Sequence, residues 1–187
     1  MTNGVDLSNQ FLIAMPTLSD PNFHQAVALV CEHNEEGALG VVINRPLEVM
    51  LSELMEHMEI TPTTGDFQRA PVYGGGPVQT ERGFILHQPL GSWESTLPIA
   101  DDLGMTVSRD ILAAIAAGEG PTHYLVTLGY AGWSAGQLEQ ELADNAWLTC
   151  PADPKIIFER PAGERWRAAA SRLGVDLDLL AGDAGHA

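Results

Sequence analysis

The segment "HQAVALVCEHNEEGALGVVINRP" constrains the fold more than any other part of this sequence. It contains two apolar runs, Ala26–Cys31 and Ala38–Ile43, on either side of the polar stretch His33–Gly37. Apolar runs of this length that are joined by a short polar turn predict a β-hairpin. The chain must therefore provide a sheet in which both strands of this hairpin are largely buried.

Weaker patterns predict the other elements. Strands are expected over 11–16, 83–88, 122–130 and 155–159, with short strands around Ile99 and Thr106. Helices are expected from about Ser52, then over 109–118 with Ser108 as the cap, over 135–145 and over 164–174. Strands and helices alternate too irregularly for a repeat or a series of βαβ units. The sequence predicts one domain over 1–187, of the α/β (α+β) class, with a mixed and curved sheet.

Composition excludes several classes of protein. The chain has 187 residues and a formal net charge of −16, and such a charge disfavours direct binding to nucleic acid. Its N-terminus lacks the features of a secretory signal, and it has no apolar run of about 18 residues, so we expect no membrane span. With only two cysteines, Cys31 and Cys150, a reducing compartment is the simpler expectation, and we predict a cytoplasmic protein.

Ser134 is the one residue with the sequence context of a catalytic nucleophile. The residues Gly132-Trp133-Ser134-Ala135-Gly136 match the G-x-S-x-G pattern, and they lie between a predicted strand and a predicted helix. The only downstream histidine is His186, two residues from the end of the chain, where a general base is rarely held in place. The alternative is a capping box, in which the Ser134 hydroxyl accepts from the Gln137 backbone and the Gln137 side chain reaches back. We favour the cap.

A polar row follows along the same predicted helix. Gln137, Glu141 and Asn145 are spaced four residues apart, and Trp133 and Trp147 lie at the two ends of the segment. Such a row can line a cleft framed by the two tryptophans, or it can be the half-exposed flank of an amphipathic helix.

Two other places combine polar groups or glycine with strand ends. Asn44 and Arg45 end a strand before Pro46, where they can meet a ligand or satisfy local backbone and acidic groups. Gly74, Gly75 and Gly76 can form an anion-binding nest or a tight bend. The triplet fits neither a P-loop nor a dinucleotide fingerprint, so no cofactor is predicted.

Histidine spacing does not favour a metal centre. The six histidines show neither an H-x-x-x-H nor an H-x-x-E-H pattern, and there is no C-x-x-C pair. We therefore predict no metal site.

The stretches "FHQAVALVCEHNEEGALGVVINRP", "VYGGGPV", "LGYAGWSAGQLEQELADNAWL" and the terminal "GHA" together resemble the YqgE/AlgH family of bacterial proteins, over roughly residues 10–187. The resemblance implies a single cytoplasmic domain in which a strongly bent mixed sheet forms a pseudo-barrel flanked by helices. It carries over no established activity, cofactor or catalytic residue. Family members often bear the label of transcriptional regulators, although nothing in this sequence resembles a helix-turn-helix.

The sequence thus favours a non-catalytic binding or regulatory protein that acts through a protein partner or a small metabolite. The alternatives are a serine hydrolase that uses Ser134 and a transcription-associated regulator that acts through partners. We predict that the candidate residues form one surface patch: Asn44, Arg45, Tyr73, Gly74, Gly75, Gly76, Trp133, Gln137, Glu141 and Asn145.

Overall fold

A computed structural model describes residues 5–65, 67 and 69–184, and for 181–184 it describes the backbone alone. The strands of this part are β1 Gln10–Ala14, β2 Val27–Asn34, β3 Gly37–Val42, β4 Pro46–Met50, β5 Pro71–Gly74, β6 Val78–Gln88, β7 Thr96–Pro98, β8 Gly104–Thr106, β9 His123–Ser134 and β10 Trp147–Pro151. The helices are α1 Leu51–His57, α2 Arg109–Ala116, α3 Gln137–Ala143, α4 Pro154–Phe158, α5 Arg165–Ser171 and α6 Leu177–Ala184, with a 3-10 turn over Ala162–Glu164. None of the helices described is long and apolar enough to cross a membrane.

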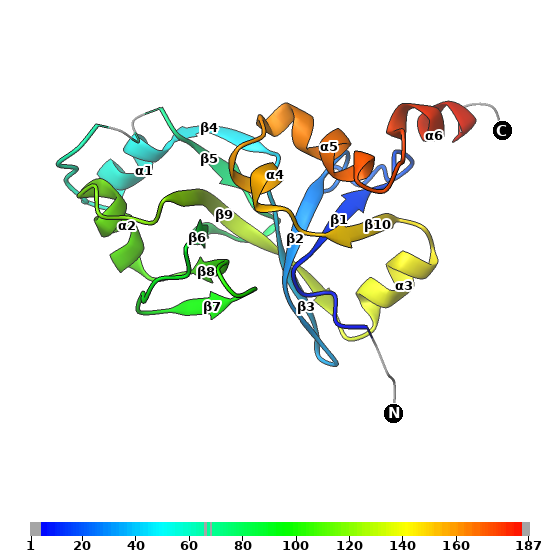
Figure 1. Cartoon of the computed structure of the whole chain (residues 1–187), viewed down its shortest axis with the longest axis horizontal. Coiled ribbons are helices and arrows are strands. Elements are labelled where there is room, and N and C mark those ends of the chain that lie inside the picture. The colour runs from blue at the N-terminus through cyan, green and yellow to red at the C-terminus, as the bar shows by residue number, and fades with distance from the viewer. Residues whose placement is uncertain (1–4, 66, 68, 185–187) are drawn as a thin grey trace.

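The strands form one strongly curled sheet in the order β10-β1-β2-β3-β9-β6-β8-β7, and β4 and β5 branch from it at β9. Every strand pair is antiparallel except β5 with β9, so the sheet is mixed. Figure 1 shows α1 and α2 at one end of the molecule, α3 at the other, and α4 and α5 along one side. The predicted fold class, a single α/β domain with a bent mixed sheet flanked by helices, is confirmed.

The predicted hairpin is β2 and β3, paired from Ala28 opposite Val42 to Asn34 opposite Gly37. A β-bulge between Val30 and Glu32 changes the register near the tip. Val27 to Cys31 are all buried, whereas Glu32 is exposed, so the inner part of the hairpin lies in the core and its tip extends into solvent. The bulge therefore marks the point at which the hairpin leaves the core.

β9 is the central strand because it pairs with three others. Tyr73 of β5 and Phe84 of β6 both lie opposite Thr127, so these two strands flank β9 on opposite sides. Further along, β3 takes the place of β5, with Ala38 opposite Trp133. Within β9, Gly129 has a φ of +80°, a conformation that glycine adopts without strain.

The glycine triplet carries the chain across β9, from β5 on one side to β6 on the other. Gly75 donates its N–H to Leu128 O at 2.8 Å and accepts from Val42 N at 2.8 Å. A Cβ on Gly76 would lie 2.1 Å from the carbonyl carbon of Tyr130, and the φ of Gly76 is +157°. The glycines thus allow close approach of backbone to backbone, which favours the bend over a ligand nest.

Three apolar clusters hold the helices to the sheet. α4 and α5 contribute Ile157 and Trp166 to the largest cluster, α1 and α2 pack Leu51 and Ile111 into a second, and Leu138 of α3 packs with Trp133 and Trp147 in a third. Helix α2 agrees with the prediction, including Gly118 at positive φ just after its end.

Several local predictions are wrong. Residues 155–159 do not form a strand, because Asp153 caps helix α4 by accepting from Lys155 N at 3.0 Å, and Pro154 begins that helix. Ser108 occupies the cap position of α2 without capping it, since its hydroxyl donates to Asp110 Oδ1 at 2.5 Å. The helix predicted over 135–145 is shorter, over Gln137–Ala143. Strands β4, β5 and β10 were not predicted.

Candidate functional site

Ser134 is the last residue of β9 and does not lie at the tip of a strained turn. The positive φ of this turn falls on Gly136, at +77°, and Gly136 is the N-cap of α3. The Ser134 backbone N–H and hydroxyl both donate to Gln137 Oε1, at 2.9 and 3.2 Å. Gln137 therefore reaches back as the capping box predicts. The prediction that the Ser134 hydroxyl caps the helix is wrong, because the helix begins at Gln137 and its N-cap is Gly136.

The imidazole nearest to this region in strand register is that of His33, and both of its nitrogens are engaged. His33 lies opposite Ala38, which lies opposite Trp133. Its Nδ1 accepts from the Leu7 N–H at 3.0 Å, so its Nε2 carries the proton and donates to the Glu139 carboxylate. No nitrogen is left to accept a proton from Ser134, and within the described residues no serine triad is assembled. His186 lies outside those residues.

Glu141, which is half buried, is the centre of a hydrogen-bond network that runs from two buried tryptophans to the exposed Gln137. Its Oε1 accepts from Trp133 Nε1 at 3.1 Å and from Trp147 Nε1 at 2.9 Å, and its Oε2 accepts from Gln137 Nε2 at 2.9 Å. The two indole rings make an edge contact, with centroids 6.2 Å apart. The predicted row thus joins Gln137 to Glu141. Asn145 does not continue it, because it lies two residues beyond the helix with φ at +60°.

Asn44 and Arg45 hold the loop formed by residues 18–25, which connects β1 to β2. Asn44 accepts from Val27 N at 3.0 Å and donates to Gln25 O at 2.9 Å. The Arg45 guanidinium donates to the carbonyl oxygens of Pro21 at 3.0 Å, of His24 at 2.7 Å, and of Asn22. These contacts are to backbone carbonyls, not to the acidic side chain that one sequence interpretation expected.

Phe23, at the tip of this loop, connects Arg45 to the tryptophan pair. Its ring stacks on Trp133 with centroids 6.2 Å apart and makes an edge contact with Trp147 at 5.5 Å. Arg45 and Glu141 thus hold the same aromatic cluster of Phe23, Trp133 and Trp147. Arg45 holds it through the loop backbone, and Glu141 holds it through the indole N–H groups. The sequence did not single out Phe23.

Tyr73 and the glycine triplet lie elsewhere. Tyr73 is buried in the largest apolar cluster, with the Arg165 guanidinium 5.1 Å from its ring centroid. Gly75 and Gly76 are in contact with the β9 backbone. The structure therefore connects five of the predicted residues: Asn44, Arg45, Trp133, Gln137 and Glu141. Gly74 meets this set through its backbone alone, where its N–H donates to Arg45 O at 2.8 Å. The others lie apart from its side-chain contacts: Tyr73, Gly75, Gly76 and Asn145.

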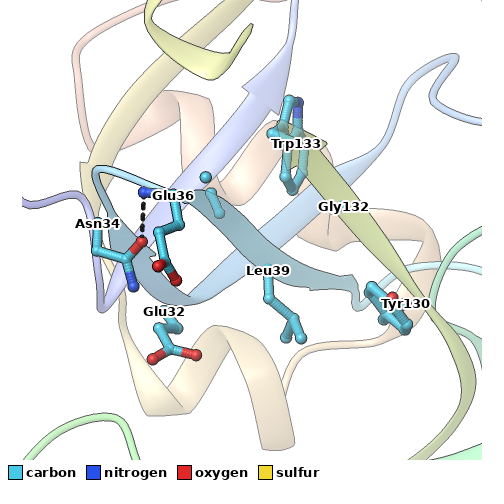
Figure 2. Close-up of a pocket in the computed structure, with 9 residues that line it drawn as sticks. Glu32, Asn34, Glu36, Leu39, Tyr130, Gly132 and Trp133 are labelled. Atoms are coloured by element: carbon cyan, nitrogen blue, oxygen red, sulfur yellow. Dashed lines mark hydrogen bonds between the residues drawn. The ribbon is translucent and has the colours of Figure 1, made fainter. Parts of the chain in front are cut away.

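A groove of about 400 Å³ lies over the tips of β2 and β3 and the end of β9. Glu32, Leu39 and Gly132 are in register across the three strands, as are Asn34, Gly37 and Ser134. Gly132 has no side chain, which leaves the space beside the Tyr130 ring open, whereas a Cβ on Gly37 would meet the Trp133 backbone. Figure 2 shows Glu32 and Leu39 extending to one side of the strands, with Tyr130 at the end of the row and Glu36 and Asn34 at the hairpin turn.

The groove combines exposed acidic groups with half-buried apolar ones. Glu32, Asn34 and Glu36 are exposed, whereas Leu39 and Tyr130 are half buried. Sequence reasoning missed these residues, although a charged residue that directly follows the apolar run of a strand, as Glu32 does, was the available signal. Trp133 lines the groove as well, so the groove adjoins the tryptophan cluster.

The end of β9 also has a free strand edge beside the groove. Val78, the first residue of β6, lies opposite Tyr130, and no described strand covers the β6 side of β9 beyond it. The Ser134 N–H points away from β3, towards Gln137. Alternate residues of an antiparallel strand direct their N–H and C=O groups to the same side, so the backbone of Gly132 is directed to this edge too.

Metal-ligating side chains do not gather in the described part of the chain, where no group of three or more His, Cys, Asp or Glu residues could hold an ion. Cys31 and Cys150 are both buried free thiols, and burial raises the pKa of each. These thiols are inert by position.

Comparison with known proteins places the chain among relatives of the same length. It is 58% identical over 187 residues to a UPF0301 protein of Thioalkalivibrio sulfidiphilus, covering 100% of both chains. It is 54% identical to the AlgH protein of Pseudomonas aeruginosa, whose solution structure matches with a TM-score of 0.80 over 96% of this chain and 95% of that one. A Corynebacterium diphtheriae protein of known crystal structure shares the fold at 21% identity, with a TM-score of 0.76 over 97% of this chain and 94% of that one. The family model described as AlgH-like matches residues 11–178, and the chain belongs to the AlgH-like family.

Proposed function

We propose that this AlgH-like chain is a non-catalytic binding protein, and that the groove over β2, β3 and β9 is its docking surface for a protein partner. The observation that carries the proposal is the row Glu32–Leu39–Gly132, which places a carboxylate, an apolar side chain and an open backbone side by side. An extended peptide can pair with such an edge while its side chains meet the groove.

Charge identifies the kind of peptide. Glu32 and Glu36 are exposed at the groove, and the whole chain carries −16. A basic segment is attracted over a long range and meets opposite charge on arrival, which speeds association and fixes its register. Leu39 and Tyr130 add apolar contact area for the aliphatic stems of lysine and arginine. The partner is therefore a protein with a basic, extended segment.

Within the part of the chain that the structure describes, no free general base lies next to Ser134, which supports the non-catalytic part of the proposal. The Ser134 hydroxyl is engaged by Gln137, and the His33 ring by Leu7 and Glu139. We place the protein in the cytoplasm, where buried free thiols such as Cys31 stay reduced. A regulatory role would act through the partner that the groove binds.

Peptide titration followed by backbone amide NMR tests the binding surface. A short peptide with alternating lysine and leucine should shift the amides of Gly37, Leu39 and Gly132 saturably, and its glutamate counterpart should not. The Glu32→Gln/Glu36→Gln double variant should weaken binding at least tenfold, whereas the matched pair Glu48→Gln/Glu53→Gln on β4 and α1 should not. Shifts that map to another surface would overturn the proposal.

A fluorophosphonate probe tests the catalytic alternative. The probe should label neither the native chain nor the Ser134→Ala variant. Covalent labelling of the native chain that disappears in Ser134→Ala would show an activated serine and reject the non-catalytic assignment.

A further inference from the structure

The basic residues of this acidic chain are concentrated in one short segment. The sequence contains nine lysines and arginines in total, and five of them lie between residues 155 and 172: Lys155, Arg160, Arg165, Arg167 and Arg172. This segment forms α4, α5 and the turn between them, on a part of the molecule separate from the groove. A local positive region is thus built into a chain whose total charge is −16.

Three of these five cations line one hollow of about 350 Å³, between α4 and α5. They are Lys155, Arg160 and Arg172, all exposed at its surface. The other two are used elsewhere. Arg165 is buried and donates to Arg160 O at 2.9 Å and to Ile43 O, and Arg167 forms an ion pair with Asp178 at 2.8 Å.

The cations of the hollow keep donors free for a ligand. The Lys155 ammonium has no hydrogen-bond or ion-pair partner among the described side chains. Arg160 meets Glu164 only at 3.4 Å, and both side chains are more than half exposed, so this pair is weak. Arg172 donates to Pro151 O through Nη1 and also interacts with the Cys150 thiol. Its guanidinium has further N–H groups.

Charge balance in the hollow matches a dianion. Among the residues that line the hollow, Lys155, Arg160 and Arg172 contribute +3 and Asp153 contributes −1, which gives +2. Glu164, the weak partner of Arg160, is not part of this lining. Asp153 is held in place as the cap of α4, where it accepts from Lys155 N at 3.0 Å. The Ser171 hydroxyl donates to Arg167 O at 2.9 Å, so recognition of an oxyanion depends on the cations.

The acidic remainder of the chain selects a small ligand over a polyanion. A nucleic acid that entered this hollow would extend beyond it along a chain whose net charge is −16 and would be repelled. A single phosphate group is confined to the hollow, where arginine and lysine donors recognise it well. Ile156 and Ala168 also line the hollow and provide apolar contact for a small organic group.

We propose that the hollow between α4 and α5 is a binding site for a phosphate dianion, carried by a small molecule or free. Lys155, Arg160 and Arg172 hold the phosphate oxygens, and Asp153 sets the net charge of the site at +2. This site is distinct from the groove of the proposed function, and the proposal does not depend on peptide binding at that groove.

Titration with inorganic phosphate at constant ionic strength, followed by backbone amide NMR, tests the proposal. Saturable shifts are expected at Lys155, Ile156 and Arg172. The Lys155→Gln/Arg160→Gln variant, which changes two exposed side chains, should lower the affinity at least tenfold, and the matched Arg82→Gln/Arg109→Gln variant should change it less than twofold. Shifts that do not saturate, or an equal loss of phosphate affinity in the two double variants, would overturn the proposed phosphate site.

A second titration with glycerol phosphate distinguishes the two sources of the anion. Tighter binding than that of inorganic phosphate assigns the site to a phosphorylated small molecule, and equal binding assigns it to free phosphate. Binding of neither compound would reject the site. The peptide titration of the groove is independent of all three results.

Discussion

Trp133 and Trp147 donate their indole N–H groups to the same oxygen, Oε1 of Glu141, at 3.1 and 2.9 Å. Trp133 is the last residue but one of the central strand β9, and Trp147 begins β10 at the edge of the sheet, so a single carboxylate on α3 connects the helix to two separated strands. Both rings are more than nine-tenths buried. The arrangement makes Glu141 a structural residue of the aromatic cluster.

Removal of this carboxylate should destabilise the fold. Glu141→Ala leaves two buried indole donors unpaired, and we expect a loss of about 2 kcal/mol in the free energy of unfolding, since hydrogen bonds to charged groups contribute about 1.5–3 kcal/mol. Urea denaturation measures this loss in the free energy of unfolding. Glu48→Ala, at an exposed position on β4, should change stability by less than about 0.5 kcal/mol. Equal stability of the two variants would contradict the structural role.

Arg45 should be needed to hold the loop of residues 18–25. Arg45→Lys removes the planar fork that donates to three carbonyls, and we expect a loss of about 1–2 kcal/mol. Proteolysis should become faster within the loop, and tryptophan fluorescence should change because Phe23 loses its position on Trp133. Arg109→Lys, whose Nη2 makes only a 3.4 Å contact, is the control. An unchanged proteolytic rate would refute this function of Arg45.

Gly76 should tolerate no side chain. An alanine Cβ would lie 2.1 Å from the Tyr130 carbonyl carbon, at a φ of +157°, so Gly76→Ala should cost more than about 3 kcal/mol or prevent folding. Gly163→Ala, which meets nothing within 4 Å, should be within about 0.5 kcal/mol of the native chain. Thermal unfolding of both variants measures their stability relative to the native chain. A stable Gly76→Ala would mean that the chain does not cross β9 as described.

Stability should fall in weak acid because of His87, which is fully buried. Its Nδ1–H donates to Pro89 O at 3.0 Å and its Nε2 accepts from the Thr106 hydroxyl at 2.7 Å. Burial lowers the pKa of His87, against the smaller raising effect of Pro89. Because the folded pKa lies below the usual value of 6.5, the contribution to stability is full above pH 6.5 and is lost as pH falls through the folded pKa.

Urea unfolding from pH 8 to pH 5 measures this dependence. His87→Gln should flatten the slope below pH 6.5, and His57→Gln, at an exposed position, should retain it. If His87→Gln does not fold, NMR titration of the His87 ring in the native chain provides the same test. Protonation at or above pH 6.5 would disprove the prediction.

Strong periodic segments of the sequence predicted their elements correctly. The hairpin of β2 and β3 and helix α2 are cases in which local pattern and tertiary burial agree. Residues 155–159 show the opposite, because the three-residue apolar run Ile156–Phe158 fits a strand or a buried helical turn equally well. The proline after Asp153 was the signal that distinguishes them, since proline favours the first turn of a helix.

The candidate site was predicted only in part, for a geometric reason. Sequence spacing connected Gln137 to Glu141, and these two residues are in contact. It could not connect Arg45 to Trp133, because their link passes through Phe23 in a different loop. The groove was missed because it forms where β2, β3 and β9 become neighbours and where Gly132 lacks a side chain, and no local pattern predicts which strands pair.

The crossing of β9 at Gly76 has a consequence for how the molecule opens. β5 and β6 are consecutive in the chain yet flank β9 on opposite sides, so β9 cannot separate from one neighbour as a free edge while the crossing remains in place. The two halves of the curled sheet must therefore loosen together, and the amides of Val126 to Leu128 should exchange with solvent only through global unfolding. With this topology, the hairpin tip and its groove can open locally while β9 stays paired with β5 and β6.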